Sequence, residues 1–351
     1  MSFKIWTSLL SICVLSMTVC LAGEGVKEKP HIIPIPELEN ADTTLGTHIE
    51  INPIGKTDEM KFGNLTTFAL TPEDNVLACD AKSNEIKVIA PSGKILETWK
   101  LDFAPYTIHS CRCGEVFVAG FGVVAKLDKS GKLIKQINTE TTEFPNAKSS
   151  GIAVFGKNVF VAFGTEGSLR SRSKIVRFNR DLTKPVIIAE NMRGCCQRLD
   201  MVAWEDALYV AENARHRVVK FDTTGKVLSK WGARDRVNIE GFGSCCNPMN
   251  LYYSPKGWLY TAESGLGRIK RYSLDGEFLG LVGYVGVARF KQAGRLAAAC
   301  SNITVAANKD ESRVYVLDYK DNLIRVMERK NKGRARESEA KRSRAKDCEV
   351  K

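Results

Sequence analysis

Two vicinal cysteine pairs are the residues of this 351-residue sequence best placed to do chemistry together. They are Cys195–Cys196 and Cys245–Cys246, and a fifth thiol, Cys300, follows at a similar spacing. In an oxidising compartment, such thiols form disulfides within a pair or between pairs. As thiolates they are soft ligands that suit copper(I), zinc or an iron–sulfur cluster. The sequence therefore predicts either disulfides or a redox or metal site, and it leaves both possibilities open.

Oxygen-bearing side chains follow the cysteines at short distances. Asp200 lies four residues after Cys196, Asn250 lies four residues after Cys246, and Asn302 follows in the next unit. Carboxylate and amide oxygens are the ligands that Ca²⁺ takes in proteins, with waters completing its shell. If the fold brings the three residues together they could hold calcium. The alternative is that they only solvate a water-filled channel.

Other catalytic signatures are scarce. The four histidines occupy unrelated positions, which argues against a multi-histidine zinc centre: His31, His48, His109 and His216. The sequence has no Gly-x-Ser-x-Gly elbow, no phosphate-binding loop and no Cys-x-x-Cys-His haem motif. Cys111 and Cys113 flank an arginine in an expected turn, away from the other cysteines. The pattern favours a binding role over catalysis.

A repeat of about 40 residues must position these groups. Residues 208–212 and 217–222 reappear nearly intact as 259–263 and 268–272. Weaker copies begin near Val76, Val116, Val159 and Val314. The runs alternate with a period of two and are separated by turn pairs, which indicates strands. About six units of four short strands predict an all-β, six-bladed β-propeller.

The repeat resembles a known family. Gly151-Ile152-Ala153-Val154, followed by Phe160-Val161-Ala162, resembles the NHL repeat, and the resemblance covers roughly residues 60 to 330. The segment Gly243-Ser244-Cys245-Cys246-Asn247-Pro248 is similar to secreted bacterial NHL-like proteins with a Gly-Cys-Cys-Asn-Pro motif. The resemblance implies an exported propeller that binds or scaffolds a protein, peptide or small molecule at its channel mouth.

Aligned blades place the polar residues at one inner-strand position. Asp200, Asn250 and Asn302 fall there in the last three blades, and Thr67, Ile108 and Gly151 in the first three. The arrangement is similar to gluconolactonase and paraoxonase-type propellers, which implies a calcium-dependent lactonase or esterase as one alternative. Those proteins add a glutamate where this sequence has Thr67. The loops before the inner strands should bring Cys195, Cys196, Cys245, Cys246 and Cys300 to one rim of the channel.

Four segments make up the expected organisation. Residues 1–22 resemble a signal peptide, with Lys4 before an uncharged apolar run and Ala22 at the cleavage site. Residues 23–58 form a linker and closing strand, 59–330 the propeller, and 331–351 a basic disordered tail. The last unit lacks a fourth apolar strand, so we expect residues 47–55 to pair with 323–327 and close the ring. The alternative is that residues 24–58 are a linker only.

Charge and hydropathy limit the partners. The net charge is +12, and residues 329–351 contain ten Lys or Arg against four Asp or Glu. This tail could contact acidic surfaces, but it has no aromatic residues and no recognition helix is visible, so sequence-specific nucleic-acid binding is not expected. No stretch after the signal is long and apolar enough to span a bilayer. We therefore expect a periplasmic or secreted protein without a transmembrane span in the mature chain.

Overall fold

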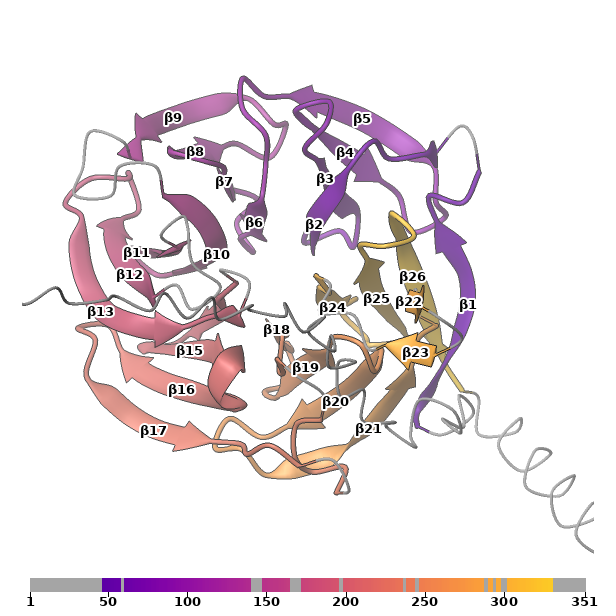
Figure 1. Ribbon diagram of the computed structural model, residues 1–351. Coiled ribbons are helices and arrows are strands. Elements are labelled where there is room, and N and C mark those ends of the chain that lie inside the picture. Colours follow the sequence, from indigo (N-terminus) through magenta and orange to yellow (C-terminus); the bar gives the residue numbers. More distant parts are fainter. Residues whose placement is uncertain are drawn as a thin grey trace, which may run out of the picture. The chain divides into compact units, whose positions relative to one another are not determined.

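Six four-stranded antiparallel sheets surround a central axis in the computed structural model (Figure 1). The structure describes residues 46–57, 60–139, 147–164, 172–195, 198–235, 238–243, 246–286, 290–292, 295–297 and 302–330. The predicted six-bladed, all-β propeller is therefore confirmed. The expected signal peptide and basic tail lie outside the described residues. Within the described part, no helix has the length and apolar character needed to cross a membrane.

Each blade runs from an innermost to an outermost strand. The first three blades are β2 (Leu65–Leu70), β3 (Val76–Asp80), β4 (Glu85–Ile89) and β5 (Ile95–Lys100); β6 (Thr107–Ser110), β7 (Val116–Ala119), β8 (Val123–Leu127) and β9 (Leu133–Asn138); and β10 (Lys148–Phe155), β11 (Asn158–Gly164), β12 (Arg172–Asn179) and β13 (Val186–Arg193).

The fourth and fifth blades follow the same order. They are β14 (Asp200–Trp204), β15 (Ala207–Glu212), β16 (Arg217–Asp222) and β17 (Val227–Trp231); and β18 (Asn250–Tyr253), β19 (Leu259–Glu263), β20 (Arg268–Tyr272) and β21 (Phe278–Tyr284). A 3₁₀ turn, η4 (Asn213–Arg215), joins β15 to β16, and a hairpin of β22 (Phe290–Gln292) and β23 (Arg295–Ala297) precedes the last blade.

The sixth blade is closed by the N-terminal strand, as predicted. It contains β24 (Val305–Ala307), β25 (Arg313–Asp318) and β26 (Leu323–Arg329), and β1 (His48–Ile54) adds the outer strand. Ile51 pairs with Val326 in the antiparallel register. The imidazole Nε2 of the buried His48 donates to the carbonyl of Glu311 (2.9 Å). Joining both ends of the chain in one sheet removes the unpaired edge that an open ring would leave.

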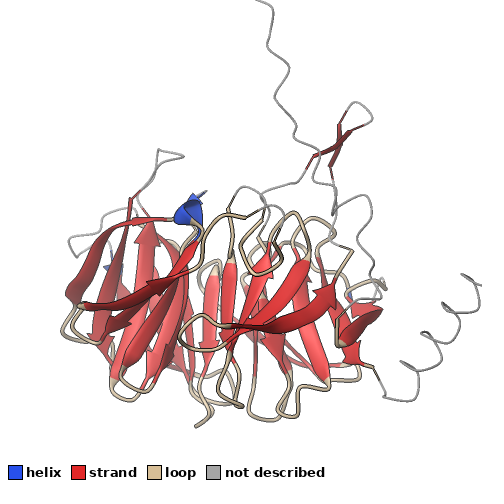
Figure 2. Ribbon diagram, turned by 90° about the horizontal axis from the view of Figure 1, so that it is seen from below, coloured by secondary structure: helices blue, strands red, loops and turns tan. Residues whose placement is uncertain are grey.

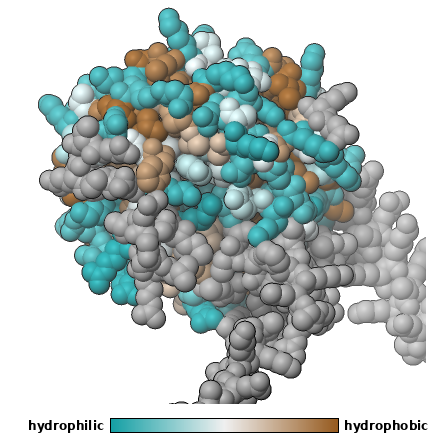
Figure 3. All heavy atoms as spheres, turned by 45° about the horizontal axis from the view of Figure 1, so that its top comes forward, coloured by the Kyte–Doolittle hydropathy of each residue, from teal (hydrophilic) through white to brown (hydrophobic). Residues whose placement is uncertain are grey.

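Burial decreases from the second strand outward. All five residues of β3 and of β19 are buried, because neighbouring blades cover both faces of these strands. The outer strands instead expose apolar side chains, including Leu96, Leu133, Ile134, Val186, Leu228 and Leu279. Figure 3 shows such apolar residues as separate patches among hydrophilic ones on the visible face.

Acidic residues end four of the second strands: Asp80, Glu212, Glu263 and Asp318. Asp80 accepts hydrogen bonds from the backbone N–H groups of Gly63 and Asn64 (2.6 and 2.8 Å), and Glu263 accepts one from Gly243 (3.1 Å). Asp80 and Glu263 therefore fix the loops that lead into the innermost strands of their blades. Asp318 instead accepts from the backbone N–H groups of Lys320 and Asp321 in the turn after its own strand (3.2 Å each).

Candidate functional site in the central channel

The ring has two mouths, one at each end of the innermost strands. We call the end where these strands begin the cysteine mouth, because Cys195 and Cys246 precede β14 and β18 there. We call the other end the turn mouth. It is formed by the turns after β2, β6, β10, β14, β18 and β24, and the edge-on view of Figure 2 shows strands running between the two faces.

At the cysteine mouth, the structure brings two predicted residues to one apolar cluster. Cys246 is buried in a cluster with Met249 and Ile303, and the partly buried Cys195 packs against it. Cys196, Cys245 and Cys300 lie outside the described residues. No disulfide joins any two of the five described cysteines. The shared thiol centre therefore stays a prediction, with Cys195 and Cys246 placed compatibly with it.

The axial polar residues form hydrogen bonds between neighbouring blades. The carboxylate of Asp200 accepts a hydrogen bond from Leu251 N in the following blade (2.7 Å). The amide oxygen of Asn250 does the same for Val305 N (2.8 Å). Asn302 donates from its side-chain nitrogen to the carbonyl of Thr66. All three residues thus have structural partners.

Strand register corrects the alignment of these positions in two blades. Asp200 and Asn250 stand opposite Ala211 and Ala262, the residues before the second-strand acids. In the sixth blade that position belongs to Thr304, whose carbonyl accepts from Leu317 N, so Asn302 precedes it by two residues. In the second blade it belongs to Thr107, opposite Ala119, and not to Ile108. The alignment was wrong because the turn between the first two strands differs in length among blades.

The axial position does not fit a calcium ion. Its six residues are Thr67, Thr107, Gly151, Asp200, Asn250 and Thr304. They supply one carboxylate, and it is already held by the next blade, whereas Ca²⁺ takes six to eight oxygens and favours several carboxylates. Across the described ranges, no group of three or more His, Cys, Asp or Glu is placed to hold a metal. Gly151 has no side chain because a Cβ would overlap the carbonyl of Leu199.

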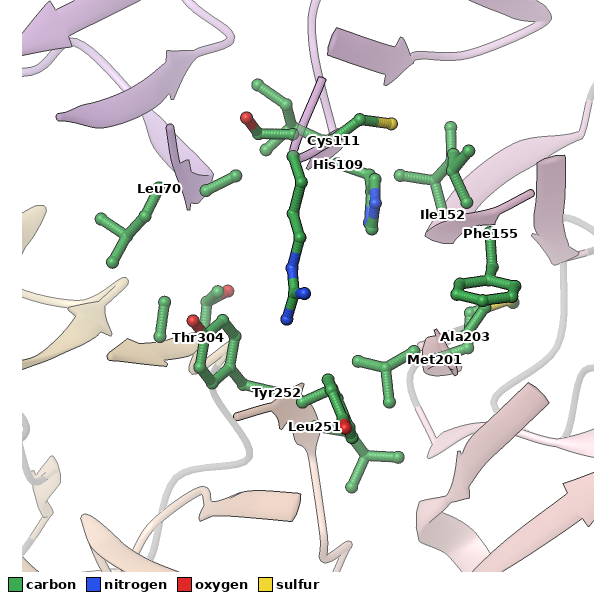
Figure 4. A pocket seen from close by; sticks show the side chains of 18 of the residues that line it. Leu70, His109, Cys111, Ile152, Phe155, Met201, Ala203, Leu251, Tyr252 and Thr304 are labelled. Carbon is green, nitrogen blue, oxygen red and sulfur yellow. The ribbon is translucent and has the colours of Figure 1, made fainter. Parts of the chain in front are cut away.

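A cavity of about 870 Å³ occupies the channel between the axial residues and the turn mouth (Figure 4). Its inner end is polar, with Thr67, Thr107, Asp200, Asn250 and Thr304. Burial raises the pKa of Asp200 to about 7, although hydrogen bonds from Leu251 and Met201 oppose the shift. This carboxyl group is therefore largely uncharged below neutral pH.

The wall of the cavity is apolar. It is built from the second to the sixth blade by Ile108, Ile152, Met201, Val202, Leu251 and Val305. His109 lies in this wall, and burial lowers the pKa of its imidazole to about 4, with Arg180 adding to the effect. Figure 4 places the His109 ring beside the cavity, near Ile152. Because the ring is neutral and makes no hydrogen bond to a described residue, it can donate or accept one from a bound molecule.

Aromatic residues end three successive innermost strands at the turn mouth. Trp204 stacks on Tyr253, with ring centroids 4.1 Å apart and planes at 17°, and Phe155 leans against Trp204 at 5.7 Å. All three line the cavity. The guanidinium of Arg112 lies over the Trp204 ring, 5.0 Å from its centroid.

Cys111 and Cys113 occupy the predicted turn at this mouth, opposite Cys195 and Cys246. The turn is closed by hydrogen bonds from Cys111 N to Glu115 O and from Gly114 N to Cys111 O (2.8 and 2.9 Å). Burial raises the pKa of the Cys111 thiol to about 12, so Cys111 is protonated at neutral pH. The exposed Cys113 accepts a contact from Arg180 at 3.0 Å.

The sequence analysis missed the residues that define this cavity. Arg112 occupies no repeated position, and His109 was set aside because its three fellow histidines lie elsewhere. One signal was available: Phe155, Trp204 and Tyr253 each end an innermost strand in consecutive blades. Aromatic residues recurring at the channel end of successive repeats indicate a binding mouth.

Comparisons with known proteins identify the architecture. No protein-family model and no curated protein matches the sequence. Among solved structures, a calcium-binding protein, regucalcin, from Agrobacterium tumefaciens is similar, with 13% identity, a TM-score of 0.54, and coverage of 79% of this chain and 93% of that one. A luciferin-regenerating enzyme is similar at 14% identity and a TM-score of 0.52, covering 77% and 93%. At such identities the likeness shows the propeller fold alone.

Proposed function

We propose that this protein binds a small amphipathic organic molecule in its central channel, through the turn mouth. The proposal is carried by the cavity of about 870 Å³, whose polar and apolar lining residues are separated along the channel axis. Ligand sites commonly enclose about 300 to 1,000 Å³ and combine apolar walls with a few placed polar groups. Here a polar inner end, an apolar wall and a cationic, aromatic mouth follow one another along the axis.

Two wider features of the proposal rest on the sequence. The repeat pattern supports a place among NHL-type propellers, and the signal-like residues 1–22 support export to the periplasm or beyond. A calcium-dependent lactonase or esterase has less support, because the axial position offers only one carboxylate. Binding without a bound metal is therefore the function that we put forward.

Filling the cavity tests this function. Ala69 lines the cavity and is half-buried, so Ala69→Trp should occupy volume without disturbing the fully buried second strands. A matched control, Lys230→Trp, adds the same side chain to an exposed position on β17. Binding of 2-naphthylacetate, measured by equilibrium dialysis at equal circular dichroism, should fall at least about tenfold in the first variant and stay within about twofold in the control. Equal binding by both variants would place the ligand elsewhere.

A thiol centre at the cysteine mouth is the second candidate. It is favoured by the packing of Cys195 against the cluster that contains Cys246. Elemental analysis and thiol titration of the purified protein would decide it. Stoichiometric iron, copper or zinc that is lost on Cys195→Ser together with Cys246→Ser supports the centre, whereas no metal with oxidised cysteines supports disulfides.

A further inference from the structure

Arg112 and Lys309 are the cations of the cavity lining that make no ion pair within the described residues, and of the two, Arg112 contacts an aromatic ring. Arg112 lies in the turn after β6, lines the cavity, and reaches Trp204 of the fourth blade, past the intervening third blade. In the described part of the chain, its guanidinium makes this ring contact and no hydrogen bond or ion pair. Its five N–H donors are therefore available at the mouth.

The second arginine of the lining behaves differently. Arg180 donates from Nε to Glu115 (2.7 Å), from Nη1 to the carbonyl of Gly156 (2.8 Å), and from Nη2 to Cys113. Glu115 is further neutralised by Lys126 (2.7 Å). Arg180 thus holds the turns of the mouth together, while Arg112 has no such structural partner.

The remaining charges at this mouth leave it positive. Besides the two arginines, the lining contains Lys309, Asp74 and the half-buried Asp200. Asp74 accepts from the backbone N–H of Lys309 (3.1 Å), and Arg180 is matched by Glu115. Below neutral pH, where Asp200 is largely uncharged, an anion entering the cavity therefore meets an excess of positive charge.

The contact with Trp204 positions the guanidinium. Its carbon lies over the ring, 5.0 Å from the centroid, and a guanidinium over an aromatic face retains N–H donors whose planar fork matches a carboxylate in a bidentate pair. Trp204 packs against Tyr253 and Phe155, and these contacts fix the orientation of the ring that Arg112 contacts. The adjoining wall is apolar, which suits a hydrocarbon or aromatic body behind the charged group.

We propose that Arg112 binds a carboxylate of the ligand, and that Trp204 is a positioning residue that fixes the guanidinium for this contact. This proposal rests on the proposed function, since it names the class of molecule held in the same cavity. The ligand class is an organic acid with an apolar body, oriented with its carboxylate at the turn mouth and its other end toward Asp200. A guanidinium fork pairs with carboxylates and phosphates alike, so the test includes a phosphonate on the same ring system.

Four probes with the same ring system test the proposal: 2-naphthylacetate, 2-naphthylacetamide, 2-naphthylethylamine and 2-naphthylmethylphosphonate. Dissociation constants from equilibrium dialysis should show the acetate binding about tenfold tighter than the amide and tighter still than the amine. Arg112→Gln should remove this preference while changing the affinity for the amide less than about twofold. Arg112→Lys should leave a partial preference, because lysine keeps the charge but loses the fork.

The role of Trp204 is tested by the same comparison of the dissociation constants of the acetate and the amide. Trp204→Leu should lower the preference for acetate over amide, and Trp204→Phe should restore most of it, a pattern that a purely structural role would not produce. Arg193→Gln, an exposed arginine on β13 at the other end of the ring, is the matched control and should change nothing.

The outcomes separate the two proposals. Equal binding of all four probes, or tightest binding of the amine or the phosphonate, overturns the carboxylate site and leaves cavity binding standing. A preference for acetate that survives in Arg112→Gln overturns the role of Arg112. If no probe binds to the wild-type protein, both proposals fail.

Discussion

The two mouths of this propeller are built from the same strands but use their polar residues in opposite ways. At the cysteine mouth, the acidic residues are paired: Glu212 contacts Arg215 and Arg217 (3.0 and 2.5 Å), and Asp318 contacts Arg325 (2.7 Å). At the turn mouth, Arg112 has no ionic partner among the described residues. The acids of the cysteine mouth therefore stabilise the ring, whereas the turn mouth also presents Arg112, which we propose binds the ligand.

Repetition explains the difference. The acids at the cysteine mouth recur in four of the six blades, where they hold loops at that end of the ring. Arg112 and His109 occur once each and serve no repeated packing need. In a repeat protein, a side chain that departs from the repeat and lacks a structural partner is a strong candidate for function.

Removing the closing strand should have the largest effect, and it tests whether stability belongs to the ring as a whole. Deleting residues 24–58 removes β1, including the ion pair of Glu50 with Arg325 (2.7 Å) and the buried His48. We expect a loss of about 4 kcal/mol or more, and a fall in Tm of about 10 °C. Deleting only residues 24–45 is the control and should leave Tm within about 2 °C. A shortened protein without β1 that melts at the wild-type temperature would contradict ring closure.

Breaking a buried charge network at the cysteine mouth should have the next largest effect on stability. It tests whether the two mouths are independent. The carboxylate of Glu263 lies 2.8 Å from Arg268 and 2.5 Å from Lys270, and all three side chains are buried. Glu263→Gln removes the carboxylate that both buried cations contact, so we expect a loss of about 3–5 kcal/mol in urea unfolding. The control Glu277→Gln changes an exposed residue in the same blade and should cost under about 0.5 kcal/mol. The affinity of the folded Glu263→Gln protein for a cavity ligand should not change. A loss of that affinity would show that the two mouths depend on each other.

Asp200 gives a pH-dependent test at the boundary between the two regions. Its pKa in the folded state is about 7, above its ordinary value of 3.8, so the folded protein holds this proton more tightly than the unfolded chain. The stabilisation of the folded state by this bound proton is therefore fully present below about pH 4 and is lost as pH rises toward 7 and above. Asp200→Asn removes the titration but keeps the acceptor for Leu251 N, as Asn250 does in the next blade.

We expect Asp200→Asn to stabilise the protein by about 1–2 kcal/mol at pH 8, after allowance for its partial exposure, and by under about 0.5 kcal/mol at pH 4. Urea unfolding at the two pH values measures this difference. Asn250→Asp is the reciprocal variant and should lose stability at pH 8 only. A gain from Asp200→Asn that is the same at both pH values would show that the carboxylate is not destabilised by burial.

The repeats made the architecture predictable from sequence. Alternating residues in 208–212 and 259–263 required strands, their number required six blades, and the absence of a fourth strand after residue 327 required a donor such as β1. These inferences depend on local periodicity and on satisfying backbone hydrogen bonds. Both are properties that a sequence carries directly.

The candidate site was less predictable because it depends on register and on long side chains. The shift of the axial position from Asn302 to Thr304 follows from turn length, which periodicity does not determine. The contact of Arg112 with Trp204 joins residues 92 positions apart on blades that are not adjacent. Such a contact follows from the ring geometry and cannot be obtained from either local segment.

The smallest expected effects come from the two arginines of the turn mouth, and they test the comparison most closely. Arg180→Gln removes the ion pair with Glu115 and the bond to the Gly156 carbonyl, so we expect a cost of about 1 kcal/mol for this half-buried group. Arg112→Gln removes only a ring contact and should cost under about 0.5 kcal/mol. Urea unfolding of the two single variants and of the double variant should give additive changes, because the side chains share no hydrogen-bonded partner. If Arg112→Gln proves as costly as Arg180→Gln, Arg112 stabilises the fold, and the turn mouth differs from the cysteine mouth less than we infer.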